Sequence, residues 1–379
     1  MKLGFVYYLI LFSFLNLKGQ NISNQYFEGN GNVVSTAVPF LLFNPDARSN
    51  SLGGSGVSTE PDIFSSHWNS AKLSQIEGDY GIGLSYLPWL KSIDPNIYLT
   101  TINGFKRLDR RTCLGFGVYY FSLGQTIFKD ESGNQNGVGY PNEFSLEATF
   151  SERFGRHFSL GVTGKYIHSD LTNGQIFLGK ETSPGNTGAI DFSFYYNRIW
   201  ELKNPIHLSL GLNLSNLGPK INYGLNNSSF LPSNLRFGVS IGKIFNDIHY
   251  TNFSLEFNKL LVPTLPIIDS KGNIISGQDP NVGAFKGILS SFTDAPGGLK
   301  EELQEISISP AFEYRFGEII SIRTGMLLVN KNFGNKKLLD FGLGLKIAKN
   351  LDLSFSYQAN LVPLSSITNT FTLSLSAIL

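Results

Sequence analysis

Apolar and polar residues alternate with a period of two along much of the chain. In residues 205–216, five aliphatic side chains occupy every second position, and small or polar residues stand between them. This is the pattern of a β-strand with one apolar face. Residues 187–198, 337–347 and 368–379 repeat it. The sequence therefore predicts an all-β protein.

Fourteen segments carry this pattern, and most are nine to twelve residues long. That is the length a tilted strand needs to cross the hydrocarbon core of a bilayer. No segment reaches eighteen consecutive apolar residues, so ordinary transmembrane helices are not expected. The fourteen segments are residues 79–87, 97–106, 112–123, 143–154, 158–169, 187–198, 205–216, 233–244, 250–259, 304–316, 319–328, 337–347, 351–360 and 368–379.

Two further features favour a membrane barrel over a soluble sandwich, which also alternates. The polar face of the segments carries charges, whereas the opposite face is aliphatic and aromatic, as in a barrel whose apolar face contacts lipid. Short connections alternate with longer ones, as periplasmic turns alternate with external loops. We predict a 14-stranded antiparallel transmembrane β-barrel in residues 79–379, with residues 260–303 as a long external loop. The polar-face charges are Glu147, Lys165, Asp191, Arg236, Glu256, Glu313, Arg323 and Lys346.

The N-terminus indicates export. Lys2 precedes an apolar stretch from Leu3 to Leu17, and the chain turns polar by residue 20. This is the layout of a secretory signal peptide, predicted here as residues 1–20, and the stretch is short for a membrane anchor. The expected location is the bacterial outer membrane, with the loops exposed at the cell surface. Thirty basic and twenty-nine acidic residues form no basic stripe, so nucleic-acid binding is not expected.

Residues 21–78 precede the first predicted strand and are expected to form a plug, or hatch, because side chains alone do not fill a barrel this wide. The glycine run Gly53-Gly54-Ser55-Gly56 lacks the Lys-Ser/Thr that a phosphate loop needs. His67 has serines and an aspartate near it in the chain, but adjacency in sequence does not make a catalytic triad. The five histidines lack the spacing of metal ligands, so we predict no enzyme, cofactor or metal site.

Three groups of residues resemble the PorV family, the outer-membrane barrels of the Bacteroidetes type IX secretion system, which are similar to FadL fatty-acid transporters. The resemblance implies hatch residues Asn44, Pro45, Asp46, Trp68 and Asn69. Ser70 departs from the family, which usually has proline there. The three groups are Asn44-Pro-Asp-Ala-Arg48 with Gly53-Gly54, Pro61-Asp62 and His67-Trp-Asn-Ser-Ala-Lys-Leu73; Leu214-Ser-Asn-Leu-Gly-Pro-Lys-Ile-Asn-Tyr223 with Phe230-Leu-Pro232; and Phe292-Thr-Asp-Ala-Pro-Gly-Gly298 with Glu301-Glu302-Leu303.

The resemblance implies a non-enzymatic protein that receives cargo bearing a C-terminal sorting domain. It would cap the lateral opening of an SprA-type translocon and deliver the cargo to a PorU-type sortase and attachment complex. The apolar content of residues 260–303 suits a surface covered by another protein, or one that packs on itself over the barrel mouth. The alternative function is a FadL-type transporter of hydrophobic small molecules, which the charged lumen disfavours. The loop residues expected to contact partners are Phe292, Asp294, Pro296, Gly297, Gly298, Glu301 and Glu302.

Overall fold

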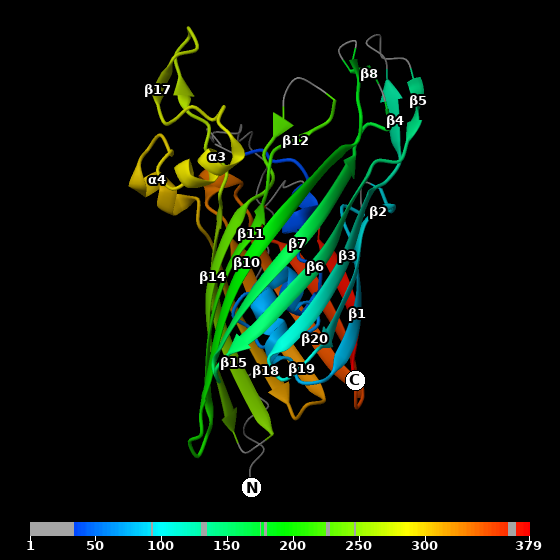
Figure 1. The fold of residues 1–379 in the computed structure, drawn as a ribbon, viewed down its shortest axis with the longest axis vertical. Helices are drawn as coiled ribbons and strands as arrows, with labels where there is room; N and C mark the ends of the chain where they lie inside the picture. The colour runs from blue at the N-terminus through cyan, green and yellow to red at the C-terminus, as the bar shows by residue number, and fades with distance from the viewer. Residues whose placement is uncertain are drawn as a thin grey trace, which may run out of the picture. The chain divides into compact units, whose positions relative to one another are not determined.

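Fourteen antiparallel strands close into a β-barrel in the computed structural model (Figure 1). Each strand pairs with the next one in the wall, and the last pairs back onto the first, so the wall has no free edge. The predicted all-β, 14-stranded barrel is confirmed. The wall strands are β1 (Tyr80–Pro88), β2 (Ile97–Arg107), β3 (Thr112–Leu123), β6 (Asn142–Phe154), β7 (Phe158–Asp170), β10 (Gly185–Trp200), β11 (Ile206–Leu217), β14 (Asn234–Phe245), β15 (His249–Leu260), β18 (Ser307–Phe316), β19 (Ile320–Leu328), β20 (Lys337–Ala348), β21 (Leu351–Asn360) and β22 (Thr370–Ile378).

The structure describes residues 34–379 apart from 92–93, 130–134, 175, 178–179, 225–227, 246–247 and 363–368. The predicted signal peptide and residues 21–33 of the predicted hatch segment lie outside the described residues.

The observed strands differ from the predicted segments mainly at their ends. The largest difference is at the tenth strand, predicted from residue 304, which begins at Ser307 because the helix α4 (Leu299–Gln304) precedes it. Gly298, which has a positive φ of 67°, stands at the start of that helix. A helix of six residues is too short to show a helical period in the sequence.

Side chains alternate between the two faces of the wall. Along β7, Phe158, Leu160 and Val162 are exposed on the outer face, while Ser159 and Thr163, at the alternate positions, are buried toward the lumen. The same alternation along the other strands gives the barrel an apolar outer belt and a largely polar lumen, as in membrane barrels. Among the described residues, no helix has the length and apolar character to cross a membrane.

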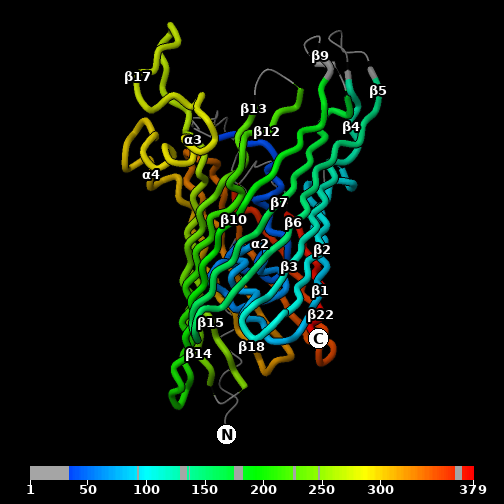
Figure 2. Tube along the Cα trace, viewed as in Figure 1, coloured from blue at the N-terminus to red at the C-terminus, as the bar shows by residue number. Residues whose placement is uncertain are grey.

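The longer connections gather at one end of the barrel, called the loop end here (Figures 1 and 2). The segment between β15 and β18, residues 261–306, carries the hairpin β16–β17 and two short helices. The remaining elements of these connections are β4 (Thr126–Lys129) with β5 (Gln135–Gly139), β8 (Ile176–Phe177) with β9 (Lys180–Glu181), β12 (Ile221–Asn222) with β13 (Ser228–Ser229), β16 (Ile267–Ile268) with β17 (Ile274–Ser276), α3 (Ala284–Ser290) and η3 (Lys331–Phe333).

The chain before β1 runs through the lumen, and we call residues 37–76 the plug. At the loop end, the backbone N–H of Ala37 donates to the carbonyl of Phe230 (3.0 Å). At the other end, the N–H of Asp79 donates to the carbonyl of Leu379 (2.8 Å), and β1 begins. Between them, four short helices lie inside the wall (Figure 2). They are η1 (Pro39–Leu42), α1 (Ala47–Ser51), α2 (Ser65–Trp68) and η2 (Ser70–Gln75).

The loop end of the lumen is apolar, which differs from the uniformly polar lumen that the strand pattern suggests. Phe40 and Leu41 of η1 pack against apolar side chains that point inward from the ends of the strands, including Leu99, Phe121 and Ile167. Apolar packing of the plug's first helix thus accounts for these inward residues.

Candidate functional site

The glycine run of the plug permits close packing. Gly53 and Gly54 have φ values of 67° and 77°, a backbone region that favours glycine. A Cβ atom at Gly56 would lie closer than 3.0 Å to the Trp68 ring. The N–H groups of Gly56 and Val57 donate to Oε2 of the wall residue Glu256 (2.8 and 2.9 Å). The anion bound by this run is therefore a carboxylate of the protein itself.

Asp46 joins two parts of the plug. Its Oδ2 accepts from the N–H of Ser49 (2.7 Å), which caps α1, and its Oδ1 accepts from the indole Nε1 of Trp68 (2.7 Å). Asp46 and Trp68 are fully buried. The guanidinium of the wall residue Arg236 lies 4.6 Å from the centre of the Trp68 ring. The predicted hatch residues Asp46 and Trp68 thus meet in one buried contact.

The other hatch residues lie in the same region. Asn69 Nδ2 donates to the carbonyls of Val57 (2.8 Å) and the wall residue Phe194 (2.9 Å). Asn44 Nδ2 donates to Oδ1 of Asn50 (3.2 Å). Pro45 is the buried residue between Asn44 and Asp46. Asn69 therefore contacts the wall, whereas Asn44 contacts another plug residue.

An ion-pair network fixes the plug to strands β18 and β19. Arg48 donates to Asp62 within the plug (2.9 Å) and to Glu313 on β18 (3.0 Å). Arg323 on β19 donates to the other oxygen of Glu313 (2.8 Å). The neighbouring carboxylates raise the pKa of Arg48 well above its ordinary value, although burial opposes this. Removing one partner would strand a buried charge, so the network resists undocking of the plug.

His67 and its neighbouring polar residues serve packing and turns. The His67 ring lies 5.0 Å from the Trp68 ring and 5.5 Å from the Tyr119 ring, measured between centroids. Burial lowers the pKa of His67 well below its ordinary value, so the imidazole is neutral. Ser65 Oγ donates to Asp62 Oδ1 (3.1 Å), and Ser66 Oγ donates to Asn103 Oδ1 on β2 (3.2 Å). These bonds engage the serines with groups other than the imidazole.

The second candidate region is the segment of residues 261–306, which we call the long loop. Asp294 Oδ2 accepts from the N–H of Thr264 (3.1 Å). Glu302 Oε1 accepts from the N–H of Ala295 (2.9 Å), and Glu302 Oε2 accepts from Lys259 Nζ at the end of β15 (2.9 Å). Asp294 and Glu302 are buried. These two predicted contact residues therefore hold the loop together.

The remaining predicted loop residues are more accessible. Phe292 is 44% exposed, and Gly297 and Gly298 are exposed at the start of α4. The carbonyl of Pro296 accepts from Ser276 Oγ (2.8 Å) and so ties this turn to β17. Glu301 Oε2 accepts from the N–H of Gly297. Phe292 and the two glycines are thus accessible at this turn, whereas Pro296 and Glu301 accept hydrogen bonds from within the loop.

Exposed apolar side chains cover much of the long loop. Leu261 and Val262 are buried next to β15, but most apolar residues beyond them face outward. An exposed apolar area of this extent indicates a surface that another molecule covers. The exposed members are Leu265, Ile267, Ile268, Ile274, Ile275, Phe285, Leu289, Phe292, Leu299 and Leu303.

Three carboxylates of the long loop are close enough to hold a cation. One ligand oxygen from each of Asp294, Glu302 and Glu305 lies within 4.8 Å of the others. Lys259 Nζ already forms ion pairs with Glu302 and Glu305. Burial raises the pKa of Asp294 to about 6. The lysine supplies the positive charge of this cluster, which acts as a structural anchor for the loop.

Comparison with known proteins gives the family. The model of the type IX secretion system protein PorV matches residues 26–267. The chain belongs to the PorV family. The match includes the plug and nine wall strands, up to β15. No curated protein shows significant similarity to the sequence.

Solved structures similar to this PorV-family chain share its fold. The Ralstonia pickettii toluene transporter TbuX aligns with a TM-score of 0.50 and 12% identity, over 89% of this chain and 99% of its own. The P. putida toluene transporter TodX aligns with a TM-score of 0.51 and 11% identity, over 88% and 98%. At this identity the likeness concerns the fold alone. Family and fold are of non-enzymatic kinds and indicate an outer-membrane barrel.

Sequence reasoning missed the partners that fix the plug and the loop in this PorV-family barrel. The sequence pattern places Glu313 and Glu256 in the lumen but does not give their partners. Glu313 pairs with Arg48, and Glu256 accepts from Gly56 of the glycine run; each pair is 200 or more positions apart in the chain. Lys259 gave one signal, a charge at the end of a predicted strand. Pairing across such distances is not visible in one sequence.

Proposed function

We propose that this barrel is an outer-membrane component of type IX secretion that binds cargo carrying a C-terminal sorting domain. In this role it caps the lateral opening of an SprA-type translocon and passes the cargo to a PorU-type sortase and attachment complex. The signal peptide exports the chain, and the long loop lies at the cell surface. The observation that carries the proposal is the exposed apolar surface of the long loop on a barrel of the PorV family.

The filled lumen supports this role. Plug side chains bond to wall strands on different sides of the barrel, through Asn50 to β22, Asn69 to β10 and Arg48 to β18. A barrel filled in this way presents its loops and outer wall to partners. Cargo handling at those surfaces requires no opening of the lumen.

The arrangement of the long loop also supports partner binding. Its buried side is fixed to the barrel through Lys259, while Ile275, Phe285 and Leu289 are 67%, 75% and 58% exposed. Anchored apolar side chains of this kind can dock without a large ordering cost. They provide the apolar core that a protein interface needs.

The test is a triple substitution, Ile275→Ser, Phe285→Ser and Leu289→Ser, in the native host. These exposed positions should tolerate serine, so barrel assembly should be unchanged. We expect sorting-domain cargo to accumulate in the periplasm or to lose its attachment to the surface. The matched control is Ile127→Ser with Val138→Ser, which removes exposed apolar side chains from the β4–β5 hairpin at the same end. Normal cargo attachment in the triple variant would refute the docking role.

A FadL-type transporter of hydrophobic small molecules is the second candidate, favoured by the apolar loop end of the lumen. In that role Phe40 and Leu41 would occupy the site of a hydrophobic substrate and leave it during transport. Deletion of the gene separates the two functions. Loss of cargo attachment with normal uptake of a hydrophobic compound supports secretion, whereas the reverse supports transport.

A further inference from the structure

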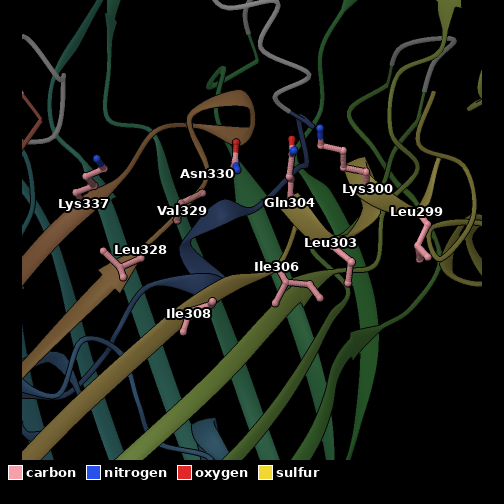
Figure 3. Close-up of a pocket in the computed structure, with 10 residues that line it drawn as sticks. All are labelled: Leu299, Lys300, Leu303, Gln304, Ile306, Ile308, Leu328, Val329, Asn330 and Lys337. Carbon is pink, nitrogen blue, oxygen red and sulfur yellow. The ribbon is translucent and has the colours of Figure 1, made fainter. Parts of the chain in front are cut away.

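A cavity of about 990 Å³ lies on the outer wall beneath α4 (Figure 3). Its floor contains Ile308 on β18 and Leu328 on β19, which face each other in the strand register, and Lys337 on β20 is next in that row. Ser307 and Ser309, on either side of Ile308, are buried toward the lumen. The row therefore points outward, and the cavity lies outside the barrel.

The cavity is amphipathic. Leu299 and Leu303 of α4 are 76% and 60% exposed and form its roof together with Lys300. In Figure 3, the amino groups of Lys300 and Lys337 point to the upper side of the view, while Ile308 and Leu328 lie lower. Within the part of the chain that the structure describes, neither lysine forms an ion pair. An apolar space thus has two available cations at its rim.

The apolar floor continues into the belt that faces lipid. Phe312 on β18 and Phe341 on β20 are 42% and 50% exposed on the same outer face as the cavity floor. A lipid in that belt could place an acyl chain against Ile308 without leaving the membrane. Its headgroup would then lie at the level of the two lysines, at the loop end.

We propose that this cavity binds a membrane lipid with an anionic headgroup. The acyl chain fills the space between α4 and the row of Ile308 and Leu328, and the anionic headgroup lies between Lys300 and Lys337, which stand on opposite sides of the cavity in Figure 3. Continuity with the lipid belt favours an acyl chain, and the two lysines at the rim favour an anionic headgroup. The volume lies within the range of small-molecule sites. This inference does not depend on the proposed role in secretion.

The test measures lipid binding to the purified full barrel by native mass spectrometry. Phosphatidylglycerol is titrated against phosphatidylcholine with the same acyl chains. We expect tighter binding of phosphatidylglycerol, and a loss of roughly five-fold in affinity for each lysine removed in Lys300→Gln with Lys337→Gln. Leu303→Asp, at an exposed position, should weaken binding of both lipids because it places a charge in the acyl-chain space.

The charge-matched control is Lys203→Gln with Lys349→Gln, which removes two exposed lysines from turns at the opposite end of the barrel. This control should bind phosphatidylglycerol as the unchanged protein does. Equal binding of the two lipids by the unchanged protein, or unchanged binding in the double-lysine cavity variant, would overturn the proposal. Cavity variants that bind lipid normally but lose cargo attachment would assign the cavity to a protein partner instead.

Discussion

Asp46 is the residue through which the attachment of the plug can be tested most sharply. Both of its carboxylate oxygens accept hydrogen bonds from N–H groups, those of Ser49 and Trp68. Asp46→Ala removes both acceptors at once. It leaves α1 without its cap and the indole N–H without a partner in a buried site.

The expected loss can be worked from these two contacts. Removal of a helix cap costs about 0.5–2 kcal/mol. A buried donor left unsatisfied costs about 1–3 kcal/mol. Because both bonds involve one carboxylate, whose own burial is also relieved, the terms are not fully additive, and we expect about 2–4 kcal/mol in total. That equals roughly a 30- to 700-fold rise in the equilibrium constant for local opening.

Hydrogen exchange followed by mass spectrometry measures this opening directly. The amides of residues 47–57 should exchange faster by that factor, while the wall strands keep their protection. Asp46→Asn should give an exchange rate between those of the unchanged protein and Asp46→Ala, because the asparagine amide retains one acceptor oxygen. Asp269→Ala is the control, since that exposed carboxylate accepts from Lys271 and Asn273 within the β16–β17 hairpin. Protection of residues 47–57 within three-fold of the unchanged protein would refute the assigned role of Asp46.

Three further substitutions probe the plug and the long loop. Gly56→Ala should destabilise the plug by about 1–3 kcal/mol, because the added methyl group overpacks against Trp68. Hydrogen exchange of the plug amides measures this loss. The control Gly164→Ala should have no effect, since a Cβ atom there meets nothing within 4 Å. Lys259→Met should make the long loop sensitive to protease while the barrel stays folded. The buried Glu302 and the partly buried Glu305 lose their cation, at a cost of about 3–5 kcal/mol. The folded loop raises the pKa of Asp294 to about 6, so it favours the protonated carboxyl. The stability of the loop should therefore fall as pH rises from about 4 through 6. Asp294→Asn should flatten this dependence, measured as hydrogen exchange of the loop amides at pH 4 and pH 8.

The barrel was predictable because lipid and lumen impose opposite polarities on alternate residues of each strand. The pattern was therefore readable over residues 205–216 and in most other wall strands. It failed at residue 304, where α4 precedes the strand, because six helical residues leave no periodic signal. It also gave no hint that inward residues such as Leu99 and Phe121 form an apolar site for η1.

The path of the plug was less predictable than its existence. Its helices span four to six residues each, which is too short to be stable alone, so tertiary contacts decide where they form. Asp46 caps α1 with one carboxylate oxygen, and the chain returns Trp68 to the other. In the long loop, family resemblance and position suggested partner contact for Asp294 and Glu302, but both are buried in bonds within the loop and to Lys259. A polar residue in a predicted loop does not reveal which way it points.

The wall glycines show how closely the plug and the barrel depend on each other. Gly161, Gly211 and Gly325 lie on β7, β11 and β19, and a Cβ atom at any of them would lie closer than 3.0 Å to plug backbone atoms. Withdrawal of the plug would leave gaps at these positions and would separate Glu313 and Glu256 from their plug partners. Transport through the lumen requires at least part of that cost in each cycle. Cargo handling by the long loop and the outer wall requires none of it, which favours secretion over transport for this barrel.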